Sequence, residues 1–341
     1  MPLGKMKLIS RRGVKRLQVL LSFLVVLGLI GWWMMFRMPG HSYSGAFPSL
    51  TATEITIQNE LKRDVEMLAG EIGERNFIFY DNLLKSQDFL TDSLQNMGYQ
   101  VHEQIYEING KAYANLEVEI PGTEKPDEII VIGAHYDSVA GSPGANDNGT
   151  GAAAVLSLAR QFVNQPLAKT LRFVEFVNEE PPFFWTENMG SLVYAKGCRE
   201  RGEKIVGMLS LETIGYYSEE PKSQQYPSPL NLVYPTAGNF IGFVGNLDSR
   251  KLVERVISAF RRHVKYPSEG VTMPNVLPGI GWSDHWSFWQ QGYPAAMVTD
   301  TAPFRYPYYH TTEDTPDKVD YERTARVVAG LVTVIEEIGG N

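Results

Sequence analysis

The sequence predicts a three-layer α/β/α domain with a central, largely parallel mixed sheet, preceded by one transmembrane helix. Two observations support this fold class. Along most of the chain, short apolar runs typical of buried strands alternate with segments whose apolar residues recur at helical spacing. Near the N-terminus, the 20 residues 17–36 carry no charge, and at helical rise they match the hydrocarbon thickness of a bilayer. The 341 residues suffice for one large domain after such a helix.

The N-terminal segment has the charge pattern of a membrane anchor. Trp32 and Trp33 lie near its far end, where interfacial aromatic residues are common. Positive flanks stay in the cytoplasm, so we expect a cytoplasmic N-terminus and an extracytoplasmic remainder, either periplasmic or extracellular. A cleaved signal peptide is the alternative, although the apolar run is longer than is usual for one. The cations that precede the run are Lys5, Lys7, Arg11, Arg12, Lys15 and Arg16.

Charge and cysteine content narrow the function classes. The net charge is −8, and without the seven cations that precede Glu54 the remainder has 24 basic against 39 acidic residues. A nucleic-acid partner is not expected, because it would need a basic face. The single cysteine, Cys198, excludes an intramolecular disulfide framework and a cysteine-based zinc cluster. The predicted organisation is a basic tail at 1–16, a transmembrane anchor at 17–36, a linker at 37–53 and the folded domain at 54–341.

The first elements of the domain follow from spacing and turn signals. Apolar residues at steps of three and four predict a helix over 54–73. A second helix is expected at 81–97, because Gly98 is a typical stop signal. Asn109-Gly110 is a hairpin turn signal, and it predicts paired strands at 101–106 and 115–120.

The later elements alternate regularly. The continuous apolar run 129–134 indicates a strand that is buried on both faces. Chemistry in such folds collects at the carboxyl ends of the strands. The remaining predicted elements are helices at 151–163, 191–201, 249–263 and from 320 onward, and strands at 171–177, 206–211 and 295–299.

Histidines and carboxylates follow several of these strands and should meet at one sheet edge. Each alone is commonly structural, since a lone histidine, a glutamate pair or an aspartate in a turn needs no ligand. Gathered carboxylates repel one another, so the set as a whole indicates a cation. Imidazole and carboxylate without thiolate suit zinc, with manganese or cobalt as alternatives. The candidates are His135 and Asp137 after 129–134, Asp147 before the helix at 151, Glu179 and Glu180 after 171–177, Glu212 after 206–211, and His310 after 295–299.

Four motifs together resemble one enzyme family. They are Gly-Ala-His-Tyr-Asp-Ser at 133–138, Gly-Ala-Asn-Asp-Asn-Gly-Thr-Gly at 144–151, Asn-Glu-Glu at 178–180 and His-Thr-Thr-Glu-Asp-Thr at 310–315. Their order is similar to that of the co-catalytic zinc aminopeptidases, metallopeptidase family 28, which also contains glutamate carboxypeptidases and glutaminyl-peptide cyclases. The resemblance covers roughly 61–338 and identifies 54–341 as a metallopeptidase catalytic domain.

The resemblance implies a ligand set for two zinc ions. His135 and Glu212 would bind one metal, Glu180 and His310 the other, and Asp147 would bridge them. The family usually has aspartate where this chain has Glu212. Two neighbouring divalent ions can activate a water and polarise a scissile carbonyl, which is the chemistry that peptide hydrolysis needs.

The resemblance also assigns residues that do not bind metal. Asp137 would orient His135 and fix its tautomer. Glu179 would be the general base, since proton transfer needs a carboxylate that is not a ligand. The family often has a cis peptide after the bridging aspartate, here before Asn148. Asp284 either supports the site from behind the ligands or belongs to a structural loop, and the neighbouring His285 is not expected to be a ligand.

One loop departs from the family pattern. The family commonly has a glycine-rich run after the glutamates, whereas this chain has Pro-Pro-Phe-Phe-Trp at 181–185. The loop could form an aromatic wall of the substrate pocket. Packing on its own domain is the favoured interpretation, because apolar loop residues commonly pack locally.

The function expected from the sequence is a membrane-anchored, zinc-dependent aminopeptidase that acts on peptides or aminoacyl substrates. Two alternatives remain open: a glutaminyl-peptide cyclase-like enzyme with one zinc, and a non-catalytic receptor or scaffold on the same fold. The presence of His135 favours two metals and therefore hydrolysis. A scaffold would be expected to lack ligands, and only Glu212 deviates here, conservatively.

Overall fold

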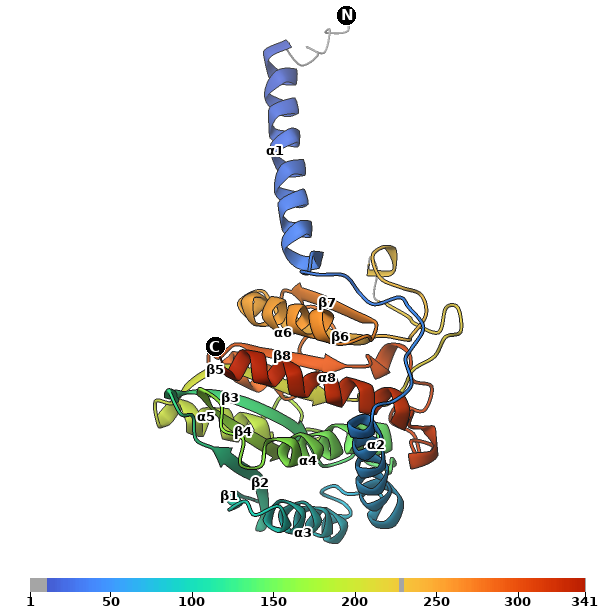
Figure 1. Cartoon of the computed structure of the whole chain (residues 1–341). Helices are drawn as coiled ribbons and strands as arrows, with labels where there is room; N and C mark the ends of the chain where they lie inside the picture. The colour runs from blue at the N-terminus through green and yellow to red at the C-terminus, as the bar shows by residue number, and fades with distance from the viewer. Residues whose placement is uncertain (1–10, 227–229, 341) are drawn as a thin grey trace, which may run out of the picture. The chain divides into compact units, whose positions relative to one another are not determined.

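The computed structural model describes residues 11–226 and 230–340, which belong to two compact units. Within the first unit, Met1–Arg37, the described part is helix α1, Arg11–Phe36 (Figure 1). The segment Arg12–Phe36 is long and apolar enough to cross a membrane, and a signal sequence would pass the same test. The first ten residues of the predicted basic tail lie outside the described residues.

The second unit, Met38–Asn341, is built on a mixed eight-stranded sheet in the order β1-β2-β4-β3-β5-β8-β6-β7. The central strands β4, β3, β5 and β8 are parallel, while β2 and β6 join them in the antiparallel sense. The strands are β1 His102–Ile108, β2 Lys111–Ile120, β3 Lys125–His135, β4 Lys169–Phe176, β5 Lys204–Glu212, β6 Ile241–Asn246, β7 Ser268–Met273 and β8 Ala295–Thr299.

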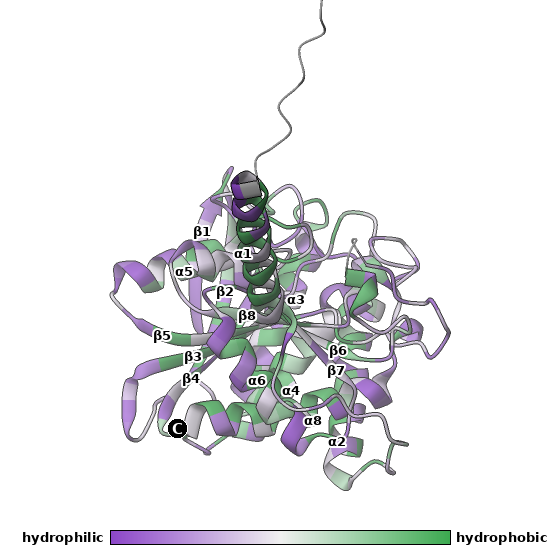
Figure 2. Ribbon diagram, turned by 90° about the horizontal axis from the view of Figure 1, so that it is seen from above, coloured by the Kyte–Doolittle hydropathy of each residue, from purple (hydrophilic) through white to green (hydrophobic). Residues whose placement is uncertain are grey.

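Helices cover both faces of this sheet, which confirms the predicted three-layer fold (Figure 1). On one face α2, α4, α6 and α8 contact one another, and on the other face α5 packs against α7. In Figure 2 α6 and α8 carry both hydrophilic and hydrophobic residues, as helices with one buried face do, whereas α1 is hydrophobic along most of its length. The helices are α2 Ala52–Val65, α3 Tyr80–Asn96, α4 Thr150–Phe162, α5 Gly190–Glu200, α6 Arg250–His263, α7 His285–Gln290 and α8 Tyr321–Gly340.

Local sequence signals explain where the first elements begin and end. Helix α2 begins two residues before the predicted position, because Thr51 and Glu54 form a reciprocal capping box. The helix continues as a π-helical turn over Glu66–Ile72 and stops at Gly73, whose φ is +78°. Asn109 and Gly110 both have positive φ in the hairpin between β1 and β2, as their sequence predicts.

Strands β6 and β7 and helix α7 were not predicted. Glycines interrupt the apolar pattern of both strands, and close packing of α6 explains why they are glycines. A Cβ atom at Gly245 would lie 2.6 Å from Val253, and one at Gly270 would lie 2.7 Å from Ile257. Helix α7 has only six residues, which is too short for a periodic pattern to stand out.

The segment between Met38 and Thr51 forms no helix or strand and lies along the second unit. Met38 is buried, and the ring of Phe47 stacks on Tyr266 with centroids 5.4 Å apart. The backbone N–H of Ser268 in β7 donates to the Ser42 hydroxyl. These contacts tie the predicted linker to the edge of the sheet.

Candidate metal centre

The carboxyl ends of three neighbouring parallel strands bring the predicted residues together. His135 is the last residue of β3, Glu179 and Glu180 follow β4, and Glu212 is the last residue of β5. All four are buried, with exposed fractions of 1%, 5%, 3% and 8%. Because parallel strands end at one edge, residues 77 positions apart in sequence meet here, as the sequence predicts.

Asp147 reaches the same place on a loop that its neighbours hold tightly. The peptide between Asp147 and Asn148 is cis, as in the family that the sequence resembles. The Asn148 side chain donates to the Leu211 carbonyl and accepts from the N–H groups of Gly151 and Thr213. The Asp314 carboxylate accepts from the N–H of Asp147 and of Asn146. The loop therefore holds the Asp147 carboxylate beside the ends of β3 and β5.

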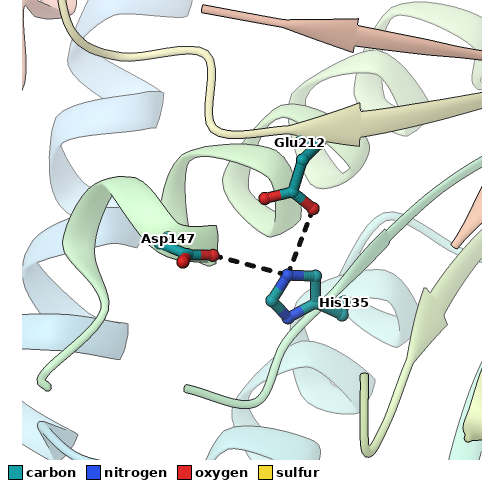
Figure 3. Close-up of side chains that lie close together, drawn as sticks. All are labelled: His135, Asp147 and Glu212. Atoms are coloured by element: carbon teal, nitrogen blue, oxygen red, sulfur yellow. Dashed lines mark ion pairs between the residues drawn. The ribbon is translucent and has the colours of Figure 1, made fainter. Parts of the chain in front are cut away.

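The two oxygens of Asp147 face two different imidazoles. Oδ1 lies 3.5 Å from His135 Nε2, and Oδ2 lies 3.0 Å from His310 Nε2. Glu212 Oε2 is 3.3 Å from the same nitrogen of His135, which Figure 3 shows between the two carboxylates. Glu180 Oε1 is 3.6 Å from His310 Nε2. Asp147 thus stands between a His135–Glu212 pair and a His310–Glu180 pair.

The electrostatics of this cluster suit divalent cations. Burial, together with the neighbouring charge of Asp147, raises the pKa of Glu180 well above its usual value. Burial lowers the pKa of His135, but the carboxylates of Glu179 and Glu212 overcome this and raise the pKa well above its ordinary value. Asp147 Oδ2 and Glu180 Oε1 are buried without a hydrogen-bond donor among the described residues. Buried oxygens facing imidazole nitrogens fit metal ions, which would neutralise the carboxylates and fill the unused acceptors.

Within residues 11–226 and 230–340, three overlapping groups of donors are close enough to share an ion. They are His135 with Asp147 and Glu212, Asp147 with Glu180 and His310, and His135 with Glu179 and Glu180. Within each group the donor atoms lie within 4.8 Å of one another. Imidazole with carboxylate is the donor set that zinc accepts in hydrolytic enzymes.

Asp137 contacts His135, as expected, and it also binds the backbone of the two glutamates. Its Oδ1 lies 3.5 Å from His135 Nδ1, and its backbone carbonyl oxygen lies 3.2 Å from the same nitrogen. Its two carboxylate oxygens also accept the backbone N–H groups of Glu179 and Glu180, at 3.1 and 3.2 Å. One buried aspartate therefore links the ends of β3 and β4 and fixes the backbone that carries both glutamates.

The segment that precedes α7 supports Glu212 from the other side. The Ser283 hydroxyl donates to Glu212 Oε2 at 2.7 Å. Asp284 is fully buried, and burial raises the pKa of its carboxyl to about 7. His285 Nε2 bonds to the Ile280 carbonyl oxygen at 2.7 Å, and burial lowers the pKa of this imidazole to about 4. His285 belongs to none of the donor groups.

Comparison with known proteins identifies the family. A family model described as peptidase family M28 matches residues 115–335, which is more than half of the chain. The chain belongs to peptidase family M28. The matched span contains every residue that the sequence places at the metal centre.

Two relatives and two solved structures are similar to this chain. The chain is 36% identical to the uncharacterized protein YfbL of Escherichia coli (strain K12) over 81% of this chain and 87% of that protein. It is 30% identical to aminopeptidase YwaD of Bacillus subtilis (strain 168) over 62% of this chain, although it spans only 43% of that relative. The structure of BSAP, a zinc aminopeptidase from Bacillus subtilis, superposes with a TM-score of 0.67, at 16% identity over 83% of this chain and 95% of that chain. A glutaminyl cyclase from Bacteroides thetaiotaomicron gives 0.62, at 16% identity over 82% and 97%.

Arg75 was not predicted from the sequence, yet it is completely buried beside the metal centre. Its guanidinium binds carbonyl oxygens from the loops that carry Asp137 and Asp147, and no motif in the sequence marks it. Burial lowers its pKa to about 10, so it is charged at neutral pH. The carbonyl oxygens that accept from Arg75 are those of Leu68, Gly73, Tyr136, Pro143 and Gly144.

The aromatic loop after the glutamates contacts its own domain through Phe183 and Trp185, although Trp185 remains 47% exposed. Phe183 meets Tyr113 edge-on, with ring centroids 5.9 Å apart. Trp185 donates from Nε1 to the Gly281 carbonyl oxygen, and its ring lies 5.7 Å from Trp286. No residue of 181–185 is among the described residues that line the pocket beside Glu212.

That pocket opens beside the metal centre. Glu212 is one of its lining residues, and most of the others are aromatic or aliphatic. Three loops wall it, around Tyr226, Ile280 and Phe304. An apolar pocket next to the predicted ligands is suited to hold part of a substrate.

Proposed function

We propose that this chain is a membrane-anchored, zinc-dependent aminopeptidase that uses two metal ions. The observation that carries the proposal is the position of Asp147, whose two buried oxygens each face a different imidazole. A carboxylate in this position is suited to bridge two cations, and each cation then has a histidine and a glutamate beside it. The proposed ligands are His135, Asp147 and Glu212 for one ion, and Asp147, Glu180 and His310 for the other.

Glu212 is compatible with a ligand role despite being longer than the usual aspartate. The extra methylene adds about 1.5 Å of reach. Glu212 is the last residue of β5, its Oε2 lies 3.3 Å from His135 Nε2, and Ser283 holds the same oxygen at 2.7 Å. These contacts support the proposal that Glu212 takes the place of the shorter side chain. We therefore propose two metals rather than one.

Glu179 is the proposed general base. Bound zinc would polarise the scissile carbonyl and make a water more acidic. The Glu179 carboxylate takes the proton from this water and gives it to the leaving amine. Burial raises the pKa of Glu179 well above its usual value, as suits a group that must both accept and donate the proton. Its backbone N–H donates to Asp137, which fixes the backbone at Glu179.

The proposed substrates are peptides or aminoacyl compounds with a free amino terminus. The pocket beside Glu212 would take the N-terminal side chain, while Glu179 and the metals act on the next peptide bond. The proposed topology has a cytoplasmic tail at 1–16, an anchor at 17–36, a linker at 37–53 and an extracytoplasmic catalytic domain at 54–341. Apolar helix α1 supports the anchor.

A substitution at Glu179 tests the proposal. The variant Glu179→Gln keeps the size of the side chain but cannot move the proton, so kcat for an L-leucine 4-nitroanilide should fall at least about 10²-fold. Zinc content should match that of the parent, because Glu179 is not a proposed ligand. The exposed Glu187, changed to Gln, is the matched control and should leave both values unchanged. Near-parental activity in Glu179→Gln would refute the role, and loss of zinc would mean that Glu179 is a ligand instead.

A further inference from the structure

A single row of paired residues crosses four strands of the sheet at the active-site edge. Glu212 of β5 pairs with Thr299 of β8, Thr299 pairs with Gly242 of β6, and Gly242 pairs with Glu269 of β7. Directly paired residues point to the same face of a sheet. The row therefore carries one carboxylate at each end on one face, and three strand spacings separate their backbones by about 14 Å.

This row forms the floor of the apolar pocket. All four residues line it, and its far end lies over β6 and β7. The opposite face of these two strands packs on α6, since a Cβ atom at Gly270 would meet Ile257 of that helix. Gly242 adds no side chain to the floor between Thr299 and Glu269.

The walls of the pocket are apolar, and their polar atoms are used elsewhere. The hydroxyl of Tyr226 donates to the Pro235 carbonyl oxygen, and that of Tyr234 donates to the Gly270 carbonyl oxygen. The amide oxygen of Gln224 accepts from Arg305 and Thr301. Rings of Phe240, Trp282 and Phe304 complete the lining. A long hydrocarbon stem fits such walls.

Glu269 places a carboxylate at the far end of this apolar pocket. The Ser42 hydroxyl donates to it, and Arg261 Nη2 forms an ion pair with it at 3.7 Å. The donors of Arg261 are used by Ser268 and by the carbonyl oxygens of Pro39 and Gly40. Burial raises the pKa of the Glu269 carboxyl although Arg261 and Ser42 act to lower it, so these neighbours do not fully offset the loss of water. A cation that entered the pocket would stabilise the carboxylate further.

We propose that Glu269 is a specificity-determining residue that selects substrates with a basic N-terminal side chain, lysine or arginine. The proposal rests on the aminopeptidase activity proposed above. From the Cα atom, leucine reaches about 4 Å, lysine about 6 Å and arginine about 7 Å. Only the two long basic side chains combine an apolar stem for the walls with a charge that reaches towards Glu269.

The test compares basic and apolar substrates on the full chain with zinc in detergent. In the variant Glu269→Gln, kcat/KM for the 4-nitroanilides of L-lysine and L-arginine should fall at least about tenfold, because a charged hydrogen bond is lost. The value for L-leucine 4-nitroanilide should change less than about twofold. Glu269→Asp keeps the charge and should lose less than Glu269→Gln. Glu254→Gln, on the α6 face, is the matched control and should change neither substrate.

Measuring the binding of ligands that cannot be cleaved tests the role of Glu269 independently of the proposed aminopeptidase activity. L-lysinol and L-leucinol have no bond to cleave, and calorimetry measures their Kd directly. Glu269→Gln should weaken L-lysinol at least about fivefold and leave L-leucinol unchanged. If the parent cleaves no 4-nitroanilide, the proposed function is wrong, and the amino alcohols still decide the role of Glu269. An equal effect of Glu269→Gln on the basic and apolar ligands, or no effect on either, would overturn the inference.

Discussion

Replacing Arg75 by methionine should destabilise the catalytic domain and loosen the metal centre. Arg75 is completely buried and joins its own segment to two backbone segments more than 60 positions away. Its three shortest hydrogen bonds go to the carbonyl oxygens of Tyr136, Pro143 and Gly144, at 2.6, 2.5 and 2.9 Å. The first precedes Asp137 and the other two precede Asp147, so the guanidinium holds both segments.

The change in the free energy of unfolding can be worked out from the carbonyl oxygens that lose their donor in Arg75→Met. Each buried carbonyl oxygen that loses its donor costs about 1–3 kcal/mol. Methionine also removes the cost of burying a guanidinium, which offsets part of this loss. Three carbonyl oxygens without a donor, less this offset, give a net destabilisation of about 3–5 kcal/mol. With an unfolding entropy of about 2.1 cal/mol/K per residue, this corresponds to a fall in Tm of about 5–8 °C for the unit Met38–Asn341.

Thermal unfolding of the full chain in detergent, followed by circular dichroism, measures this change. Arg262→Met is the matched control, because the Arg262 side chain is half exposed and its pairing with Glu337 at the surface should contribute less than about 1 kcal/mol. Arg75→Met should also bind zinc more weakly than the parent. A Tm within 2 °C of the parent would refute the argument that the guanidinium is required by these carbonyl groups.

Three further predictions follow from other residues. Glu212→Ala should lose one of two zinc ions per chain in elemental analysis, together with most activity; a parent with one zinc that the variant retains would exclude the two-metal proposal. The oxygens of Glu175 have no hydrogen-bond partner among the described residues, and burial raises the pKa of this carboxyl well above 4.5. The folded state therefore binds the Glu175 proton more tightly than the unfolded state does. As a result, the stability of the folded protein falls as the pH rises from 4.5. Glu175→Gln should remove that part of the decline in a pH series of Tm, and an unchanged pH dependence would mean that Glu175 does not contribute. A reporter fused after Ile338 should be active only outside the cytoplasm, and cytoplasmic activity would contradict the proposed topology.

The predictable part of the structure is the part that local pattern determines. Strand β3 is buried along most of its length, so its run of apolar residues marks it without ambiguity. The edge rule for parallel strands then places His135, Glu179 and Glu212 together before any coordinate is known. Strands β6 and β7 escape the same reasoning because Gly245 and Gly270 are set by the close approach of α6, which is a tertiary property.

The residues that hold the site could not be predicted for a related reason. Asp314 accepts from the N–H of Asn146, 168 positions away, and Arg75 reaches carbonyl oxygens more than 60 positions away. Every residue type has a backbone carbonyl oxygen, so the sequence does not indicate which carbonyl oxygen accepts a hydrogen bond. The role of Glu269 is hidden in the same way, because it depends on the register of β5, β8, β6 and β7.

The central claim is zinc-dependent hydrolysis at a free amino terminus. The most direct measurement compares L-leucine 4-nitroanilide with its N-acetylated form on the purified full chain, before and after chelation and after zinc is restored. We predict that the parent cleaves the free form and spares the N-acetylated form, that chelation abolishes cleavage, and that zinc restores it. Cleavage that persists without metal would contradict the claim, and so would a chain that only releases ammonia from an N-terminal glutamine, since that result would identify a cyclase.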